Sequence, residues 1–228
     1  MKRMALTALA ALVLIGVAPV AAQEINLEND DHKALYALGL LLSDRLKELK
    51  LSPEELDVVE VGIEDGVFNR EPKIVLGDHQ ATIDAFFKER YDAMVARQKA
   101  AGVGFVADAA KRPGAVQTES GMVFIGFEEG TGESPDATDT VKLHYHGTLM
   151  DGKVFDSSVA RGEPASFQLD KVIPCFREGL QKMKVGGKAT LYCPPDLAYG
   201  ERGAPPTIPP AATLVFEVEL LEIEATSN

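Results

Sequence analysis

Leucines recur at helical spacing in the region that follows residue 29. The positions on one face are Leu35, Leu38, Leu42, Leu46 and Leu49. Because a spacing of three or four residues puts side chains on a common stripe, the pattern predicts a helix from residue 30 to about residue 50. Asp30 or Asp31 can cap its first turn.

A second helix is predicted directly after the first. Ser52 is followed by Pro53 and Glu55, which together form a capping box with proline at the first helical position. The apolar stripe continues at Leu56, Val59, Ile63 and Val67. The sequence therefore predicts a helix that ends at about Phe68.

A third, longer helix is expected after the polar turn at residues 69–73. Asp78 is its candidate cap, and its apolar positions are Ile83, Phe86, Phe87, Tyr91, Met94 and Val95. A helix that runs from there to about Ala110 is about 45 Å long. The stripe thins after Val95, and Gly102 and Gly104 are poor helix formers. We therefore expect an exposed connector.

The pattern changes at residues 112–114, Arg-Pro-Gly, where proline and glycine oppose continuation of a helix. Beyond this point short apolar or alternating runs predict strands over residues 122–127, 140–149, 165–169, 188–192 and 213–223. The Asp-Gly dipeptide at 151–152 favours a hairpin, and a short helix is expected over residues 176–183. A curved antiparallel sheet wrapped on one helix is an α+β arrangement.

The first residues have the composition of a secretory signal peptide. Lys2 and Arg3 precede an apolar run over residues 4–17, and Val-Ala-Ala at 20–22 provides a cleavage site. A membrane anchor is the alternative, but the run is shorter than the roughly 20 residues that span a bilayer. We therefore expect cleavage after Ala22 and a soluble, exported protein without a membrane anchor.

These boundaries predict four segments. They are a signal peptide (1–22), a helical dimerisation region (23–77), a long connecting helix (78–112) and a carboxy-terminal domain (113–228). The two short helices and the long third helix cannot bury the leucines of this region by themselves, so we expect a homodimer through residues 30–75. The alternative is that these helices fold back on the carboxy-terminal domain, from which the long helix would separate them.

Charge and composition exclude some classes of partner and chemistry. The net charge of −12 repels nucleic-acid phosphates and anionic lipid, so no nucleic-acid partner is expected. Residues 141–221 show no Ser/His/Asp set, no CxxC pair and no phosphate-binding glycine loop. They hold instead two blocks of aromatic and aliphatic residues framed by glycine and proline, which predict an apolar pocket on the sheet.

Several separated motifs carry a family resemblance. They are HYHGTLMDGKVFDSS (144–158), VIP (172–174), GLQKMKVGGK (179–188), LAYG (197–200) and IPPAATLVFEVELL (208–221). In this order they resemble the FKBP-type peptidyl-prolyl cis/trans isomerases, over almost the whole carboxy-terminal domain. Upstream, YALGLLLSDRL (36–46) and TESGMVFIGFEEGTG (118–132) resemble the dimeric, exported Mip- and FkpA-like branch of that family.

The resemblance implies a set of site residues. Those expected around the reacting bond are Tyr145, Phe155, Asp156, Ile173, Tyr199 and Phe216, and those expected to bind substrate are Val172, Phe176, Arg161 and Ile208. The proline ring is placed over Phe176, and the amide of Ile173 is the expected hydrogen-bond donor. For each apolar residue, simple burial in the core is the alternative, because large apolar side chains are usually buried.

Asp156 is the most informative of these residues. A carboxylate in an apolar neighbourhood is costly unless it is hydrogen-bonded, so it needs a specific partner. The resemblance implies Tyr199 as that partner, with Arg161 as a possible second one. The alternative is a turn aspartate that bonds to the amides of Ser157 and Ser158.

The implied reaction needs no nucleophile and no cofactor. Rotation about a prolyl amide breaks no bond, and the barrier of about 18 to 20 kcal/mol comes from lost resonance. An apolar pocket that removes water from the amide favours the twisted, less polar form. We expect a peptidyl-prolyl isomerase that acts on exported proteins as they fold, in the periplasm of a Gram-negative bacterium.

Two other functions stay open. One is a dimeric holdase chaperone that binds unfolded chains, with weak or incidental isomerisation. The other is an interaction module with a degenerate pocket, because the chain departs from the family pattern. It has no tryptophan, so Phe176 stands where tryptophan is common, and Ala165, Ala204 and Thr207 are small. This loss of bulk weakens the expected affinity for macrolide ligands more than it weakens isomerisation.

Cys175 and Cys193 are the only cysteines. Export permits a disulfide, and closing a loop of this length contributes about 3 kcal/mol. We hypothesise that they are bonded, with two buried free thiols as the alternative. His144 and His146 share one face of a strand, but no metal site is expected, because a structural site usually takes four ligands.

Overall fold

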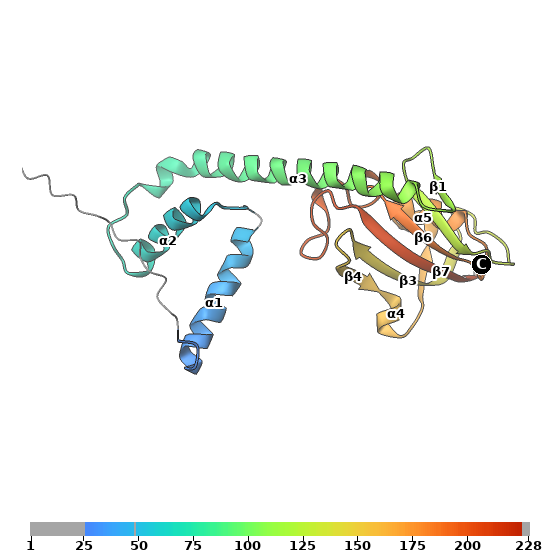
Figure 1. Cartoon of the computed structure of the whole chain (residues 1–228), viewed down its shortest axis with the longest axis horizontal. Coiled ribbons are helices and arrows are strands. Elements are labelled where there is room, and N and C mark those ends of the chain that lie inside the picture. The colour runs from blue at the N-terminus through green and yellow to red at the C-terminus, as the bar shows by residue number, and fades with distance from the viewer. Residues whose placement is uncertain (1–25, 48, 225–228) are drawn as a thin grey trace, which may run out of the picture. The chain divides into compact units, whose positions relative to one another are not determined.

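The computed structural model describes residues 26–47 and 49–224 (Figure 1). Its helices are α1 (Asp30–Lys47), α2 (Pro53–Val67), α3 (Gln80–Ala110), α4 (Ser158–Arg161) and α5 (Pro174–Gln181). Its strands are β1 (Ala115–Gln117), β2 (Val123–Glu128), β3 (Thr140–Leu149), β4 (Val154–Ser157), β5 (Ala165–Gln168), β6 (Lys188–Cys193) and β7 (Leu214–Glu224). The predicted signal peptide lies outside the described residues.

The chain divides into two compact units, the first ending at Lys47. In the described part of the first unit, α1 leaves most of its leucines open to solvent, with Leu35 65%, Leu38 51% and Leu42 57% exposed. The remaining described residues, 49–224, belong to the second unit. No helix within the described ranges is both long and apolar enough to cross a membrane.

The amino terminus of α2 carries the predicted capping box. The hydroxyl of Ser52 accepts a hydrogen bond from the amide of Glu55 at 3.2 Å, and the Glu55 carboxylate accepts one from the Ser52 amide at 2.8 Å. Arg90 of α3 forms an ion pair with the same carboxylate. The capping box and the extent of this helix are confirmed.

The start of α3 differs from the prediction. Asp78 does not cap the helix, because a 3-10 turn, η1 (Leu76–His79), precedes it and makes His79 the N-cap residue, without a side-chain cap. The helix continues through both glycines to Ala110. A Cβ at Gly102 would collide with the hydroxyl of Thr213, so glycine allows a close approach there.

The last turns of α3 pack on the sheet. Val106 and Ala109 are buried with Val123, Ile125 and Tyr192. The expectation of an exposed connector is therefore wrong for this part of the helix. The apolar positions after Val95 are sparse, but small residues bring the helix close enough to β1, β2 and β6 to bury them.

The strands form one antiparallel sheet in the order β1-β2-β6-β7-β3-β4, with β5 also paired to β3. This confirms the predicted α+β fold. The predicted strands match β2, β3, β5, β6 and β7 closely. β1, β4 and α4 have three or four residues each, too short for hydrophobic periodicity to reveal.

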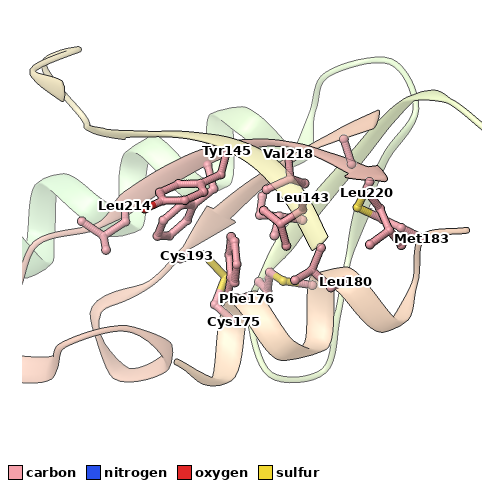
Figure 2. Packing of buried hydrophobic residues seen from close by; sticks show 14 of the residues in the cluster. Leu143, Tyr145, Cys175, Phe176, Leu180, Met183, Cys193, Leu214, Val218 and Leu220 are labelled. Atoms are coloured by element: carbon pink, nitrogen blue, oxygen red, sulfur yellow. A yellow bond between two sulfur atoms is a disulfide. The ribbon is translucent and has the colours of Figure 1, made fainter. Parts of the chain in front are cut away.

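The core lies between the sheet and α5. Figure 2 shows Phe176 and Leu180 on the face of α5 turned toward Leu143, Tyr145 and Val218 of the sheet. A Cβ at Gly179 would collide with the side chain of Leu191 in β6, so this glycine permits the close contact of helix and sheet. The position of Phe176 follows from this packing.

A disulfide joins Cys175 of α5 to Cys193 at the end of β6, with their Cα atoms 5.7 Å apart (Figure 2). Both residues are fully buried. The bond connects the first turn of the helix to the sheet, one residue before Phe176.

Candidate functional site

A cleft of about 310 Å³ opens between α5 and the strands β3, β4, β5 and β7. Its lining residues are Tyr145, Phe155, Asp156, Phe167, Lys171, Val172, Ile173, Phe176, Tyr199 and Phe216. Eight of these are residues that the sequence predicted for the site. The size and the mainly aromatic lining suit a small apolar group.

Aromatic rings form the walls and floor of the cleft. The Phe176 ring lies 5.0 Å from that of Phe216 and 6.1 Å from that of Tyr145, between ring centroids. Phe155 meets Phe216 edge-on at 5.4 Å, and Phe167 meets Phe176 edge-on at 5.9 Å. Phe176 and Phe216 are buried. The cleft thus presents both ring edges and ring faces to a ligand.

Strand pairing brings Asp156 to the same face of the sheet as Tyr145. Asp156 of β4 lies opposite Gly147 of β3, and Gly147 is two residues from Tyr145. Residues two apart on a strand point to one face. The short helix α4 follows directly and returns Arg161 toward both side chains.

The carboxylate of Asp156 accepts hydrogen bonds from the hydroxyl of Tyr145 and from the guanidinium of Arg161. Arg161 also donates to the Tyr145 oxygen at 2.9 Å. The implied bond between Asp156 and Tyr199 is therefore wrong. The register of β3 and β4 places Tyr145 beside Asp156, whereas Tyr199 lies on a separate loop.

Tyr145, Asp156 and Arg161 shift one another's pKa values. Burial opposes the charge of Asp156, but the hydrogen bonds from Tyr145 and Arg161 outweigh it and lower its pKa. Burial and the bond to Asp156 raise the pKa of Tyr145. Hydrogen bonds to Tyr145 and Asp156 raise the pKa of Arg161. At neutral pH the site holds a phenol, a carboxylate and a guanidinium.

Two hydrogen-bonding groups at the cleft have no partner within the described residues. The amide of Ile173 makes no hydrogen bond there, because it lies at the cap of α5. The hydroxyl of Tyr199 makes none either, and this side chain is 43% exposed. Both are available to a ligand in the cleft.

Some predicted residues lie elsewhere. Ile208 is 5% exposed and belongs to the core rather than to the cleft lining. Arg161 does not line the cleft but acts on it through Tyr145 and Asp156. Ala165, Ala204 and Thr207 are not among the lining residues. The expected weaker affinity for macrolide ligands stays a prediction.

Two lining residues escaped the sequence prediction, Phe167 and Lys171. The alternation along β5, with Ala165 and Phe167 on one face and Ser166 on the other, could have indicated Phe167. Lys171 has no such signal, because it lies in the 3-10 turn η2 (Leu169–Lys171).

The histidines of β3 face away from the cleft. The rings of His144 and His146 bond to the hydroxyls of Ser158 and Ser157 at 3.2 and 3.0 Å. Two carboxylates lie near them, since Glu219 and Glu217 of β7 are the strand partners of His144 and His146. Over residues 26–47 and 49–224, however, no three potential ligands are grouped to hold a metal ion.

Comparison with known proteins gives matches along most of the chain. The family of FKBP-type peptidyl-prolyl cis-trans isomerases matches residues 131–221, and the domain amino terminal to FKBP-type peptidyl-prolyl isomerase matches residues 31–125. The FKBP-type 22 kDa peptidyl-prolyl cis-trans isomerase of Escherichia coli is 43% identical over 84% of this chain and 94% of its own.

Other relatives extend the likeness to solved structures. FkpA of Escherichia coli is 39% identical over 86% of this chain and 77% of its own sequence. Its crystal structure covers 88% of this chain and 99% of its own, with a TM-score of 0.65 and 38% identity. The chain therefore belongs to the family of FKBP-type peptidyl-prolyl cis-trans isomerases and is an enzyme of that type.

Proposed function

We propose that the chain isomerises X-Pro bonds of exported proteins as they fold, in the cleft between α5 and the sheet. The observation that carries this proposal is an aromatic cleft with two hydrogen-bonding groups at its edge, the Ile173 amide and the Tyr199 hydroxyl, which have no partner in residues 26–47 and 49–224. Uncatalysed isomerisation takes tens of seconds or more, which is slow enough to limit folding.

The cleft acts on the amide by binding its twisted form. The proline ring lies over Phe176, and the preceding carbonyl lies among the ring edges of Tyr145, Phe155 and Phe216. Twisting removes amide resonance and makes the carbonyl less polar, so an apolar surface favours it over the planar ground state. The amide of Ile173 and the hydroxyl of Tyr199 hold the peptide backbone on either side.

The Tyr145, Asp156 and Arg161 group holds the cleft in shape. Asp156 and Arg161 bind the Tyr145 hydroxyl, and this fixes the tyrosine ring against Phe176. A fixed ring edge needs no reorganisation when the amide twists, which is the advantage of a preorganised site.

A cis/trans assay with a proline tetrapeptide tests this assignment. Phe216→Leu in the cleft should lower kcat/KM about tenfold or more, while the matched change Phe127→Leu should leave it unchanged. Phe127 is 65% exposed and lies outside the cleft. Equal activity in the two variants would contradict the site, and a parent protein no faster than buffer would contradict the function.

We also propose the four-segment organisation, with export, cleavage after Ala22 and a homodimer through residues 30–75. The exposed leucines of α1 support the dimer, since a second copy would remove them from water. Light scattering should give twice the chain mass. Fractionation of a Gram-negative host should place a mature protein that begins at Gln23 in the periplasm.

A holdase chaperone is the second candidate function. The large apolar area left open on α1, including Leu35, Tyr36 and Leu41, also suits unfolded chains. A Phe216→Leu variant that loses isomerisation but still suppresses aggregation of a denatured client would separate the two activities. Loss of both together would place client binding in the cleft.

A further inference from the structure

The helix α3 contacts the loop that borders the cleft. The hydroxyl of Tyr91 donates a hydrogen bond to the backbone carbonyl of Glu201 at 2.8 Å, and Lys99 Nζ lies 2.6 Å from Glu201 Oε1. The hydrogen bond to Glu201 raises the pKa of Lys99, so the lysine stays charged at neutral pH. Two side chains from successive parts of one helix thus hold a single loop residue.

Glu201 is separated from the cleft residue Tyr199 only by Gly200. It lies in η4 (Gly200–Arg202), the 3-10 turn for which Tyr199 is the N-cap residue. A displacement of Glu201 therefore moves the Tyr199 side chain, which lines the cleft.

Internal contacts make residues 199–211 one compact loop. The Gly200 carbonyl accepts a hydrogen bond from the Ala211 amide at 3.0 Å, and Ala204 and Ile208 exchange hydrogen bonds at 2.9 and 3.0 Å. Gly203 has φ +63°, and a Cβ there would collide with the carbonyls of Ile208 and Pro209. Such a loop moves as a unit rather than bending at one residue.

The helix also contacts Thr213, two residues after the loop, since Gly102 packs against this residue without room for a Cβ. The Thr213 hydroxyl is buried and has no hydrogen-bond partner within the described residues. Residues 91, 99 and 102 of α3 thus contact Glu201 near the start of the loop and Thr213 just after its end.

We propose that Tyr91, Lys99 and Glu201 are positioning residues for the isomerase reaction: they hold the 199–211 loop so that Tyr199 stays at the cleft. This rests on the proposed role of Tyr199 in binding the peptide. The connecting helix then contributes to substrate affinity although none of its residues lines the cleft. Because Tyr199 contacts the peptide before and during rotation, loosening the loop raises KM and leaves kcat nearly unchanged.

Charge reversal tests the contact in the full-length protein. Lys99→Glu and Glu201→Lys should each raise KM about two- to threefold for a proline peptide, as expected for an exposed ion pair, with kcat unchanged. The double variant should recover the parent KM. Lys88→Glu makes the same charge change on α3, where the ion-pair partner of Lys88 among the described residues is Asp92 at 2.6 Å, and should leave KM unchanged.

Two results would overturn the proposal. The first is that both single variants have the same KM as the parent protein. The second is that the single variants have a raised KM and the double variant does not return to the parent value. Tyr91→Phe gives an independent check, because it removes the bond to the Glu201 carbonyl without changing charge, and it should also raise KM alone. Inactivity of the parent protein would instead overturn the proposed function. A thermal melt of each variant establishes that it is folded.

Discussion

The hydroxyl of Tyr145 bonds to the carboxylate of Asp156, a residue 11 positions further along the chain. The antiparallel pairing of β3 with β4 creates this contact. The guanidinium of Arg161 donates a hydrogen bond to each partner, the Asp156 carboxylate and the Tyr145 hydroxyl. The ring of Tyr145 contacts Phe176 in the floor of the cleft, whereas Asp156 is half-exposed at its edge. The pair therefore connects the floor to the edge.

Replacing the Asp156 carboxylate should impair catalysis more than folding. In Asp156→Asn the tyrosine loses its charged acceptor, and Arg161 loses its counter-ion. We expect kcat/KM to fall about tenfold, as for loss of a hydrogen bond to a charged group. The control Glu163→Gln removes a nearby exposed charge and should retain parent activity; the same loss in both variants would show a general charge effect.

The pH dependence follows from the shifted pKa values. Because the pKa of Asp156 is below its usual 3.8 in the folded protein, its contribution to stability is present above about pH 4 and is lost as pH falls through the lowered value. Tyr145 stays protonated up to at least pH 10, since its pKa is raised.

We therefore expect the stability difference between the parent protein and Asp156→Asn to be constant from about pH 5 to pH 9 and to shrink below pH 4. Denaturant unfolding at a series of pH values measures it. A difference that shrinks instead between pH 5 and pH 7 would show that Asp156 does not titrate as described.

The disulfide should stabilise the catalytic domain. Cys175 and Cys193 are 18 positions apart and buried, so the double change to alanine should lower the free energy of unfolding by about 3 kcal/mol. Reduction of the parent protein should give a similar loss, while the alanine variant should not respond to reductant. Two reactive thiols in denatured, unreduced protein would refute the bond.

The position of the Phe155 ring requires glycine at residue 147. A Cβ there would lie 2.6 Å from the Phe155 ring, so Gly147→Ala should displace this ring from the cleft wall. We expect kcat/KM to fall several-fold with a smaller loss of stability, because the ring is partly exposed and can rotate outward.

Gly104→Ala is the matched control for this prediction. Nothing lies within 4 Å of a Cβ at that position, so activity should be unchanged and the helix slightly more stable, by up to about 1 kcal/mol. Parent-like kcat/KM in Gly147→Ala would mean that Phe155 makes no contribution to the reaction.

The sequence by itself determined the local elements and the family. The capping box at Ser52, the alternation along residues 140–149 and the turn at 151–152 depend on neighbouring residues, whose preferred dihedral angles and periodicity can be recognised directly. The order of separated motifs predicted the FKBP-type fold and most of the cleft.

Only the tertiary structure decided which distant groups meet. It pairs Asp156 with Tyr145 instead of Tyr199, places Ile208 in the core, adds Phe167 to the cleft and brings Lys99 of α3 to Glu201. Each of these depends on strand register, on the path of a long loop or on how closely a helix packs. Such long-range geometry is set by the whole core, and the pattern of neighbouring residues does not encode it.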